Sequence, residues 1–322
     1  MFKNYLLLIS AFVALANFNL AFANYSDIHH FPFKVDKISI SSDWGCGVEQ
    51  VYTLKCWGRN SFGQAPREIK YDQPIREIET FYDTTCVVLN DYSYSCFGKY
   101  AAEISEFSPV SKLKRINRNQ VATCIIKTDD NLYCWSPEPY YSLKLGVFNE
   151  LGRVSDFYFE NTPFIQTSCF ILLSGDLKCF DGLGSTPVIQ MSHVKSIFIK
   201  EDSYRNNVGG GCALFENNRV KCWGDKYLVK NFDGAKNVEE LYMGNWFGCL
   251  KFLDSNVRCK INQSTSPYAY GSFKYMRVDF FNNDQRKIKS FSLNNEAICG
   301  VRDDNSVSCI GHDSYGEISP ID

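Results

Sequence analysis

The feature that most constrains this chain is a cysteine interval that recurs seven times. A cysteine, nine further residues and a second cysteine stand at each place, and the residues between them change almost completely from copy to copy. A spacing that is kept while its contents drift indicates a geometric requirement within an internal repeat. The seven pairs use every cysteine of the sequence: Cys46 and Cys56, Cys86 and Cys96, Cys124 and Cys134, Cys169 and Cys179, Cys212 and Cys222, Cys249 and Cys259, and Cys299 and Cys309.

The N-terminus has the layout of a cleavable secretory signal. In MFKNYLLLISAFVALANFNLAFA, Lys3 precedes an apolar run over residues 6–16, and small residues stand at Ala21 and Ala23. A membrane anchor is the competing interpretation, but the apolar run is too short to cross about 30 Å of hydrocarbon. We therefore expect a signal peptide over residues 1–23, a mature domain over residues 24–322 without membrane insertion, and a secreted or periplasmic location.

The interpretation of the cysteines depends on the expected export of the protein. In an oxidising compartment, an even number of cysteines at fixed intervals indicates a disulfide framework. Zinc binding is the alternative, but the sequence has no C-x-x-C pair, and its four histidines (His29, His30, His193 and His312) are out of step with the repeat. We therefore expect seven disulfides, no metal and no cofactor.

The residues between the cysteines predict an antiparallel hairpin. With the first cysteine of each unit as position 0, positions +2 and +8 are apolar in thirteen of fourteen cases, and Lys251 is the exception. In a hairpin centred on +5, position +2 lies opposite +8 and the two cysteines lie opposite one another, all on one face. Opposed Cβ atoms lie about 4.5–5.5 Å apart, close to disulfide distance. The interval is therefore the length of a hairpin whose ends a disulfide joins.

Turn residues occupy the centre of most units, as in TDDN, LSGD, ENN, LDSN and DDNS of units three to seven. Gly175, Asn218 and Asn305 stand at +6, where a three-residue hairpin loop takes a left-handed residue. Units one and two have Tyr52 and Tyr92 there, so the turn type of these two units is left open.

Further strands complete each unit. Strand-like runs such as KISIS and REIETF precede the first cysteine by about eight residues, and segments such as AAEISEFSPVSKL and STPVIQMS leave room for a fourth strand. First cysteines follow one another after 40, 38, 45, 43, 37 and 50 residues, a spacing typical of four-stranded propeller blades. The fold class is therefore all-β, a seven-bladed β-propeller with one disulfide within each blade, whose closed ring protects the strand edges.

Residues 56–64, CWGRNSFGQ, carry a family pattern that is echoed more weakly by CWGD at 222–225 and by CIGHDSYGE at 309–317. The pattern resembles the repeat of the regulator-of-chromosome-condensation propellers, in their exported, disulfide-containing variety. The resemblance covers residues 30–322 and implies a seven-bladed propeller. Because only thirteen residues follow Cys309, we expect HFPFKVD (30–36) to supply a strand to the last blade and close the ring.

The resemblance implies several functions. Nuclear members of this family exchange nucleotide on a small GTPase and touch chromatin, so a nucleotide-exchange factor follows from the resemblance alone. Another exported propeller of this type inhibits β-lactamases, which implies that the scaffold can serve as a binding surface outside the cell. The formal net charge of −2 becomes −3 without Lys3, and the scattered basic residues predict no nucleic-acid surface.

The sequence offers few candidate catalytic residues. Each histidine falls near the ring closure or between blades, and GGG at 209–211 lacks the Gly-Lys-Ser/Thr of a phosphate loop. We therefore expect no catalytic residues and a non-enzymatic, monomeric module that binds an unidentified extracytoplasmic protein. Two alternatives stay open: an inhibitor of a secreted or periplasmic enzyme, and a hydrolase or lyase with its site in the central funnel. Carboxylates or histidines on the innermost strands would favour the hydrolase or lyase, whereas small apolar residues there would favour binding.

Loop lengths predict the working face. First-to-second and third-to-fourth connections leave a four-stranded antiparallel blade at the same face, and segments 136–149, 160–168, 200–211 and 261–275 enlarge such connections. These segments carry the residue types that dominate binding hot spots. Packing between blades is the alternative, and prolines at 137, 139 and 267 argue against it for the four tyrosines at 140, 141, 268 and 270. The candidate binding residues are Tyr140, Tyr141, Phe164, Tyr204, Arg205, Tyr268, Tyr270 and Phe273.

Overall fold

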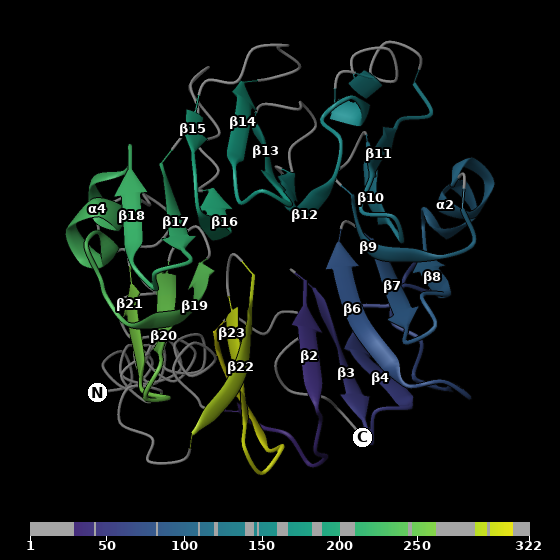
Figure 1. Cartoon of the computed structure of the whole chain (residues 1–322). Coiled ribbons are helices and arrows are strands. Elements are labelled where there is room, and N and C mark those ends of the chain that lie inside the picture. The colour runs from purple at the N-terminus through teal and green to yellow at the C-terminus, as the bar shows by residue number, and fades with distance from the viewer. Residues whose placement is uncertain are drawn as a thin grey trace, which may run out of the picture.

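The strands of the chain form seven separate antiparallel sheets that follow one another around a ring (Figure 1). The computed structural model describes residues 29–41, 43–81, 83–108, 110–118, 122–138, 145–146, 148–159, 167–181, 189–199, 210–243, 247–261, 287–294 and 297–311. Each sheet contains one of the seven disulfides, and we number the blades 1 to 7 in the order of these disulfides along the chain. The fold is the all-β, seven-bladed propeller that the sequence predicts.

Each blade has the same three consecutive strands. The first strand lies nearest the centre of the ring (Figure 1): β2 (Lys37–Ile40), β6 (Ile75–Phe81), β9 (Leu113–Arg118), β12 (Val154–Phe159), β16 (Val194–Ile199), β19 (Val238–Met243) and β22 (Ile288–Leu293). The second strands are β3 (Trp44–Glu49), β7 (Thr84–Leu89), β10 (Thr123–Lys127), β13 (Thr167–Leu172), β17 (Gly211–Phe215), β20 (Phe247–Phe252) and β23 (Ala297–Arg302). The third strands are β4 (Thr53–Gly58), β8 (Tyr94–Gly98), β11 (Leu132–Trp135), β14 (Leu177–Asp181), β18 (Val220–Trp223), β21 (Val257–Ile261) and β24 (Val307–Gly311).

The element that follows the third strand, at the outside of the ring, differs from blade to blade. A fourth strand is present in blade 1 as β5 (Glu68–Lys70) and in blade 4 as β15 (Ile189–Met191), the latter within STPVIQMS as expected. The expectation of a strand in AAEISEFSPVSKL is wrong, because α2 (Ala101–Phe107) begins that segment, and α4 (Lys226–Phe232) follows β18 in blade 5. Alanine and glutamate favour a helix over a strand, and Ile104 buries its side chain in the core between blades 2 and 3.

The disulfides join strands in the register that the spacing predicts. In every blade the two cysteines are direct cross-strand partners, and their Cα atoms lie 4.0–4.1 Å apart. Positions +2 and +8 are opposed as well, for example Val48 with Leu54 and Leu214 with Val220. One spacing therefore sets the same hairpin seven times.

The hairpin turns confirm the expected left-handed position and settle the two open cases. Gly175, Asn218 and Asn305 have φ angles of 81°, 60° and 64°. Tyr92 of blade 2 adopts the same conformation with a φ of 67°, although a side chain of this size rarely does so. In blade 1 the left-handed residues are at positions 50 and 51 instead, with φ angles of 52° and 58°.

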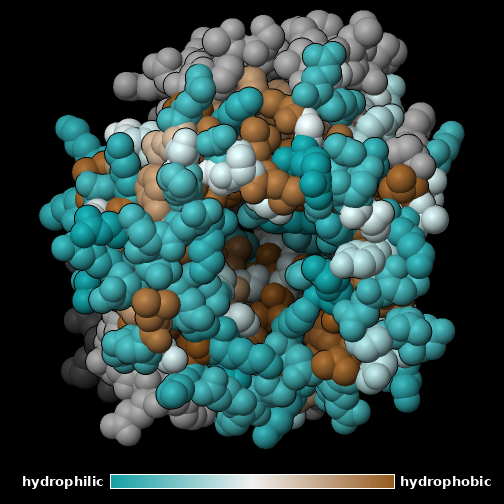
Figure 2. Space-filling view, in the orientation of Figure 1, coloured by the Kyte–Doolittle hydropathy of each residue, from teal (hydrophilic) through white to brown (hydrophobic). Residues whose placement is uncertain are grey.

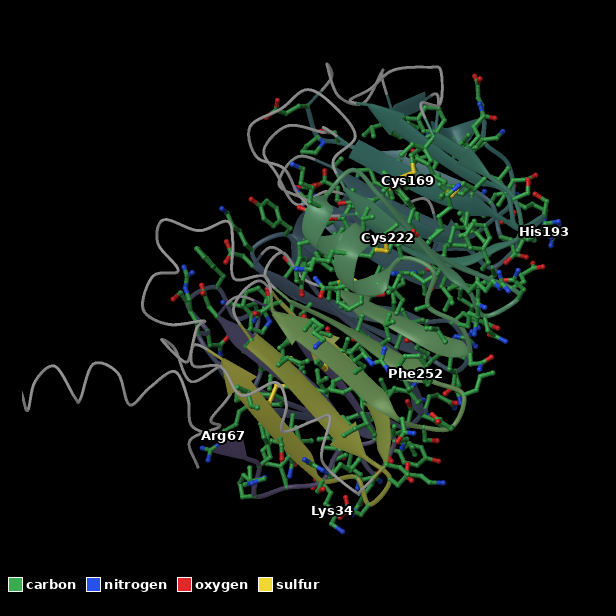
Figure 3. The ribbon with its side chains drawn as sticks, turned by 90° about the vertical axis from the view of Figure 1, so that its left-hand side faces the viewer. Lys34, Arg67, Cys169, His193, Cys222 and Phe252 are labelled. Carbon is green, nitrogen blue, oxygen red and sulfur yellow. A yellow bond between two sulfur atoms is a disulfide. The ribbon has the colours of Figure 1, made fainter. Side chains whose placement is uncertain are left out.

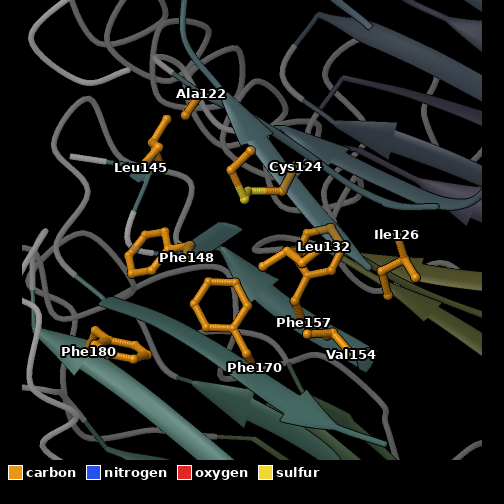
Figure 4. Packing of buried hydrophobic residues seen from close by; sticks show 11 residues of the cluster. Ala122, Cys124, Ile126, Leu132, Leu145, Phe148, Val154, Phe157, Phe170 and Phe180 are labelled. Atoms are coloured by element: carbon orange, nitrogen blue, oxygen red, sulfur yellow. A yellow bond between two sulfur atoms is a disulfide. The ribbon is translucent and has the colours of Figure 1, made fainter. Parts of the chain in front are cut away.

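Seven interblade cores hold the ring together in the described part of the chain. The face of each blade that carries the disulfide packs against the opposite face of the next blade. Figure 4 shows the core between blades 3 and 4, where Cys124, Ile126 and Leu132 meet Phe157 and Phe170. The same arrangement between blades 7 and 1 closes the circle, because the Cys299 face packs against residues of blade 1.

The N-terminal segment completes blade 7, as predicted. The strand β1 (His29–His30) pairs antiparallel with β24, and the Phe31 amide donates a hydrogen bond of 3.3 Å to the Val307 carbonyl. Phe31 and Phe33 then pack against Trp57 of blade 1, with ring centroids 4.9 and 5.7 Å from that of the indole. Residues from the start and the end of the chain therefore share one sheet.

Packing explains the Cys-Trp-Gly pattern. Trp57 lies directly opposite Gly45, and a Cβ atom on Gly45 would lie only 2.6 Å from the indole ring. Gly58 has a φ of 88°, and a Cβ atom there would lie 2.6 Å from the Asp43 carbonyl oxygen. The tryptophan and both glycines therefore form one close-packed unit, in which a larger residue has no room.

Candidate functional site

The ring has two edges that carry different connections. Figure 3 places Lys34, His193 and Phe252 at one edge and Arg67 at the opposite edge. The first, which we call the hairpin-turn edge, carries the turns between second and third strands and the connections from blade to blade. The second, the long-loop edge, carries the connections between first and second and between third and fourth strands. This division follows from four antiparallel strand positions per blade.

All eight candidate binding residues lie outside the described residues: Tyr140, Tyr141, Phe164, Tyr204, Arg205, Tyr268, Tyr270 and Phe273. The strand ends that flank two of their segments are described. β12 ends at Phe159 and β13 begins at Thr167, and β16 ends at Ile199 and β17 begins at Gly211. Both pairs of ends lie at the long-loop edge, so the segments between them leave and re-enter the ring there.

The hairpin-turn edge has a hollow at the centre of the ring. In Figure 2 hydrophilic residues surround the mouth of this hollow, and apolar atoms lie deeper inside it. The innermost strands contribute charged residues of both signs: Lys37, Arg76, Glu77, Glu79, Lys114, Arg115, Asp156, Lys195, Glu239, Glu240 and Lys289. The mouth of the hollow therefore carries charges of both signs, whereas its deeper part is apolar.

Two of these carboxylates are paired across blades. Arg115 of blade 3 lies between Glu79 of blade 2, with Nε 3.3 Å from Oε1, and Asp156 of blade 4, which its Nη1 contacts. Burial raises the pKa of the Glu79 carboxyl, the neighbouring charge of Glu77 adds to this effect, and Arg115 opposes it. Such a chain of alternating charges ties three blades together at the axis.

Lys251 makes a second cluster in blade 6. It occupies position +2, where the other blades have apolar residues, and it is 8% exposed. Its ammonium lies 3.0 Å from Glu240 Oε1 and 3.2 Å from Glu239 Oε2, and it donates a hydrogen bond of 3.1 Å to the Lys289 carbonyl of blade 7. Burial lowers the pKa of this ammonium, but Glu240 and Glu239 outweigh burial and raise it overall. The exception in the sequence pattern is therefore the centre of an ion-pair cluster within blade 6, which a hydrogen bond connects to blade 7.

A cavity of about 390 Å³ opens between blades 2, 3 and 4. Its charged walls come from innermost strands and from the turn of blade 3. Sequence analysis did not single out this site, although the charges before Ile78 and Ile116 and the aspartate at +6 of blade 3 were visible signals. The charged lining residues are Arg76, Glu77, Glu79, Lys114, Arg115 and Asp130.

The described residues offer no site for a metal ion. Among them, no three histidine, cysteine, aspartate or glutamate side chains lie together in a way that could hold one. No helix in this part of the chain has the length and the apolar character needed to cross a membrane.

The fold and its disulfides define a class of protein, a seven-bladed β-propeller with one disulfide per blade. Disulfides in this number persist in an oxidising compartment. No protein-family model matches the sequence, and no curated protein matches it.

Solved structures with the regulator-of-chromosome-condensation propeller fold are similar to this chain. The CRINKLY WD40 ectodomain of the Arabidopsis thaliana receptor kinase ACR4 has 15% identity and a TM-score of 0.55, over 89% of this chain and 99% of that one. The entire ectodomain of the Physcomitrella patens receptor kinase CR4 has 13% identity and a TM-score of 0.54, over 87% and 73% of the two chains. Human WBSCR16 has 7% identity and a TM-score of 0.56, over 88% of both chains. At these identities the likeness establishes the fold alone.

Proposed function

We propose that this protein is a secreted or periplasmic, non-enzymatic and monomeric propeller that binds a protein partner through its long-loop edge. The observation that carries the proposal is that strand ends flanking the enlarged segments, at Phe159 and Thr167 and at Ile199 and Gly211, lie at that one edge. Loops held by a rigid scaffold are the usual place for binding residues. Two of the structures with a similar fold are receptor-kinase ectodomains, which supports a location outside the cytoplasm.

Rigidity of the scaffold supports the proposal. Each blade has a disulfide between its second and third strands, and each pair of neighbouring blades shares a buried core. A preorganised ring lowers the entropy cost of holding binding loops in place. Inhibition of a secreted or periplasmic enzyme is a narrower form of the same proposal, because it requires the same edge.

The test replaces Tyr140, Tyr141, Tyr268 and Tyr270 together with alanine. We expect an unchanged melting temperature and loss of a partner that the wild-type protein captures by cross-linking in its native extracytoplasmic milieu. A matched control places serine at Leu173 and Leu253, which are 45% and 55% exposed at the hairpin-turn edge, and should capture the partner normally. Equal capture by the tyrosine variant would remove the long-loop edge as the binding surface.

A hydrolase or lyase is the second candidate, because one observation favours it. Glu79 has a raised pKa and faces a cavity together with Glu77, an arrangement that a general acid requires. Arg115 weighs against the role of general acid. Its guanidinium lies 3.3 Å from the Glu79 carboxylate and favours the ionised form, so the carboxyl group holds its proton less firmly. The test measures turnover of ester, peptide and glycoside substrates. An activity that Glu79→Gln abolishes and Glu216→Gln preserves would support an enzyme. Equal rates in both variants would exclude this site.

A further inference from the structure

The cavity between blades 2, 3 and 4 contains residues that neutralise one another. Asp130 accepts a contact from the Lys114 ammonium and a hydrogen bond of 2.8 Å from Arg153 Nη2. Lys114 first and Arg153 second lower the pKa of the Asp130 carboxyl, so it is ionised at neutral pH. Glu79 and Arg115 form the other internal pair, at 3.3 Å.

Two charges remain after this pairing. Arg76 and Glu77 line the cavity, and neither forms an ion pair with any described residue. The Arg76 guanidinium lies 5.0 Å from the centre of the Tyr92 ring, and its Nη1 is 3.5 Å from the Tyr92 hydroxyl. Its buried Nε has no hydrogen-bond partner among the described residues. A half-buried guanidinium and an exposed carboxylate, neither of them in an ion pair with a described residue, therefore line the same cavity.

We propose that this cavity binds a small zwitterion of the amino-acid type, with its carboxylate on Arg76 and its ammonium on Glu77. Arginine suits a carboxylate because its planar donors can meet both oxygens. A simple anion on Arg76 would meet the repulsion of Glu77, and a simple cation on Glu77 would meet that of Arg76. Only a molecule that carries both charges satisfies both residues.

The size of the cavity agrees with such a ligand. A volume of about 390 Å³ lies at the lower end of the range of roughly 300–1,000 Å³ that is common for small-molecule sites. A free amino acid or a dipeptide fits this space, whereas a folded protein segment does not. The site lies at the hairpin-turn edge, away from the long-loop edge, so it is independent of the proposed protein-binding function.

The experiment is isothermal titration of the mature protein with the common free amino acids and with their N-acetyl and amide derivatives. We expect at least one free amino acid to bind and each derivative to bind about tenfold more weakly, because each lacks one charge-assisted contact. Arg76→Gln should erase the preference for the acid over the amide. Glu77→Gln should erase the preference for the free amine over the N-acetyl form.

Glu216→Gln and Lys236→Gln are the matched controls. Glu216 lies in the hairpin turn of blade 5 and Lys236 in the connection from blade 5 to blade 6, so both are near the hairpin-turn edge but outside the cavity. Both controls should bind as the wild type does, and circular dichroism should show the same fold for all four variants. The proposal is overturned if no free amino acid binds at millimolar concentration. It is also overturned if Arg76→Gln and Glu77→Gln keep the wild-type preferences.

Discussion

Two halves of the inner ring use different chemistry at the same backbone position. The residue that pairs with the first cysteine is polar in blades 7, 1, 2 and 3, and aromatic in blades 4, 5 and 6. The polar half has Ser292, Ser39, Glu79 and Asn117, and the aromatic half has Tyr158, Phe198 and Tyr242.

Contacts between blades differ accordingly. In the polar half, the Ser39 and Thr80 hydroxyls lie 2.8 Å apart, and the Ile40 amide donates a hydrogen bond of 2.9 Å to Ser292 Oγ. In the aromatic half, the Tyr158 and Phe198 rings pack edge to face with centroids 6.4 Å apart. Because the disulfide beside each of these residues already sets the strand register, the inner position is free to differ from blade to blade. The charged cavity lies largely within the polar half.

Removal of a single disulfide should have the largest effect on stability. It also tests whether the disulfides have the same role in the polar and the aromatic half. We expect Cys124→Ala/Cys134→Ala and Cys212→Ala/Cys222→Ala each to lower the free energy of unfolding by about 2–3 kcal/mol, since each closes a loop of the same length. Urea unfolding of both variants measures this. A loss confined to one half would contradict a common role of the disulfides.

Truncation of the inner residues should sharpen the comparison. We expect Phe198→Ala to lower the free energy of unfolding by about 2 kcal/mol through lost apolar packing, and Ser39→Ala to lower it by about 1 kcal/mol through a lost hydrogen bond. Thermal and urea unfolding provide the values. Equal losses would show that the two halves are energetically alike despite their chemistry.

Lys251 brings an ion-pair cluster into the aromatic half. Lys251→Ala should lower the free energy of unfolding by about 1–2 kcal/mol. This is less than the loss expected on breaking a fully buried ion pair, because Glu239 and Glu240 are partly exposed and water can solvate them. Lys251→Leu, which restores the apolar pattern, should recover most of this loss.

The pH dependence of the same variants gives a second measurement. The folded pKa of Lys251 lies above the ordinary value of 10.5, so its contribution is complete below that pH and is lost as the pH rises through the raised pKa. We therefore expect the wild-type protein to lose more stability above about pH 10.5 than Lys251→Leu does. Parallel pH curves for the two proteins would rule out the ion-pair contribution.

The smallest expected effect is a gain within the polar half. Tyr92 has a φ of 67° in a turn where asparagine is favourable, so Tyr92→Asn should raise the free energy of unfolding by about 0.5–1 kcal/mol. Asn218→Tyr in blade 5 is the reverse exchange at the same turn position and should lower it by a similar amount. If Tyr92→Asn destabilises the protein, the contact between Tyr92 and Arg76 outweighs backbone strain.

The fold was predictable from sequence because one spacing carried the register of every hairpin. The helix that begins at Ala101 was missed because segment length shows only that a fourth strand has room, not that one forms. Side chains also take the place of an outer strand: the Cys134 amide donates to Asn149 Oδ1 at 2.6 Å, and the Cys222 amide donates to Asp233 Oδ1 at 2.8 Å. Such local substitutes depend on packing at the periphery, which the repeat does not encode.

The charged cavity could not be predicted in the same way. Its residues come from three blades, and their proximity depends on how the innermost strands converge at the axis. Lys251 stood out as an exception in the pattern, but its role required the cross-strand pairing of Glu240 with Lys251. The eight candidate binding residues at the long-loop edge remain a prediction, because they lie outside the described residues.

The shared sheet of blade 7 has a consequence for the order of assembly. His30 and Ser308, which are in hydrogen-bond contact at 2.7 Å, are 278 residues apart in the sequence. Because synthesis begins at the N-terminus, β1 stays without its partner strand until β24 has been made. The ring can therefore close only after the seventh blade has formed, and a chain interrupted before β24 would leave an arc with two open ends.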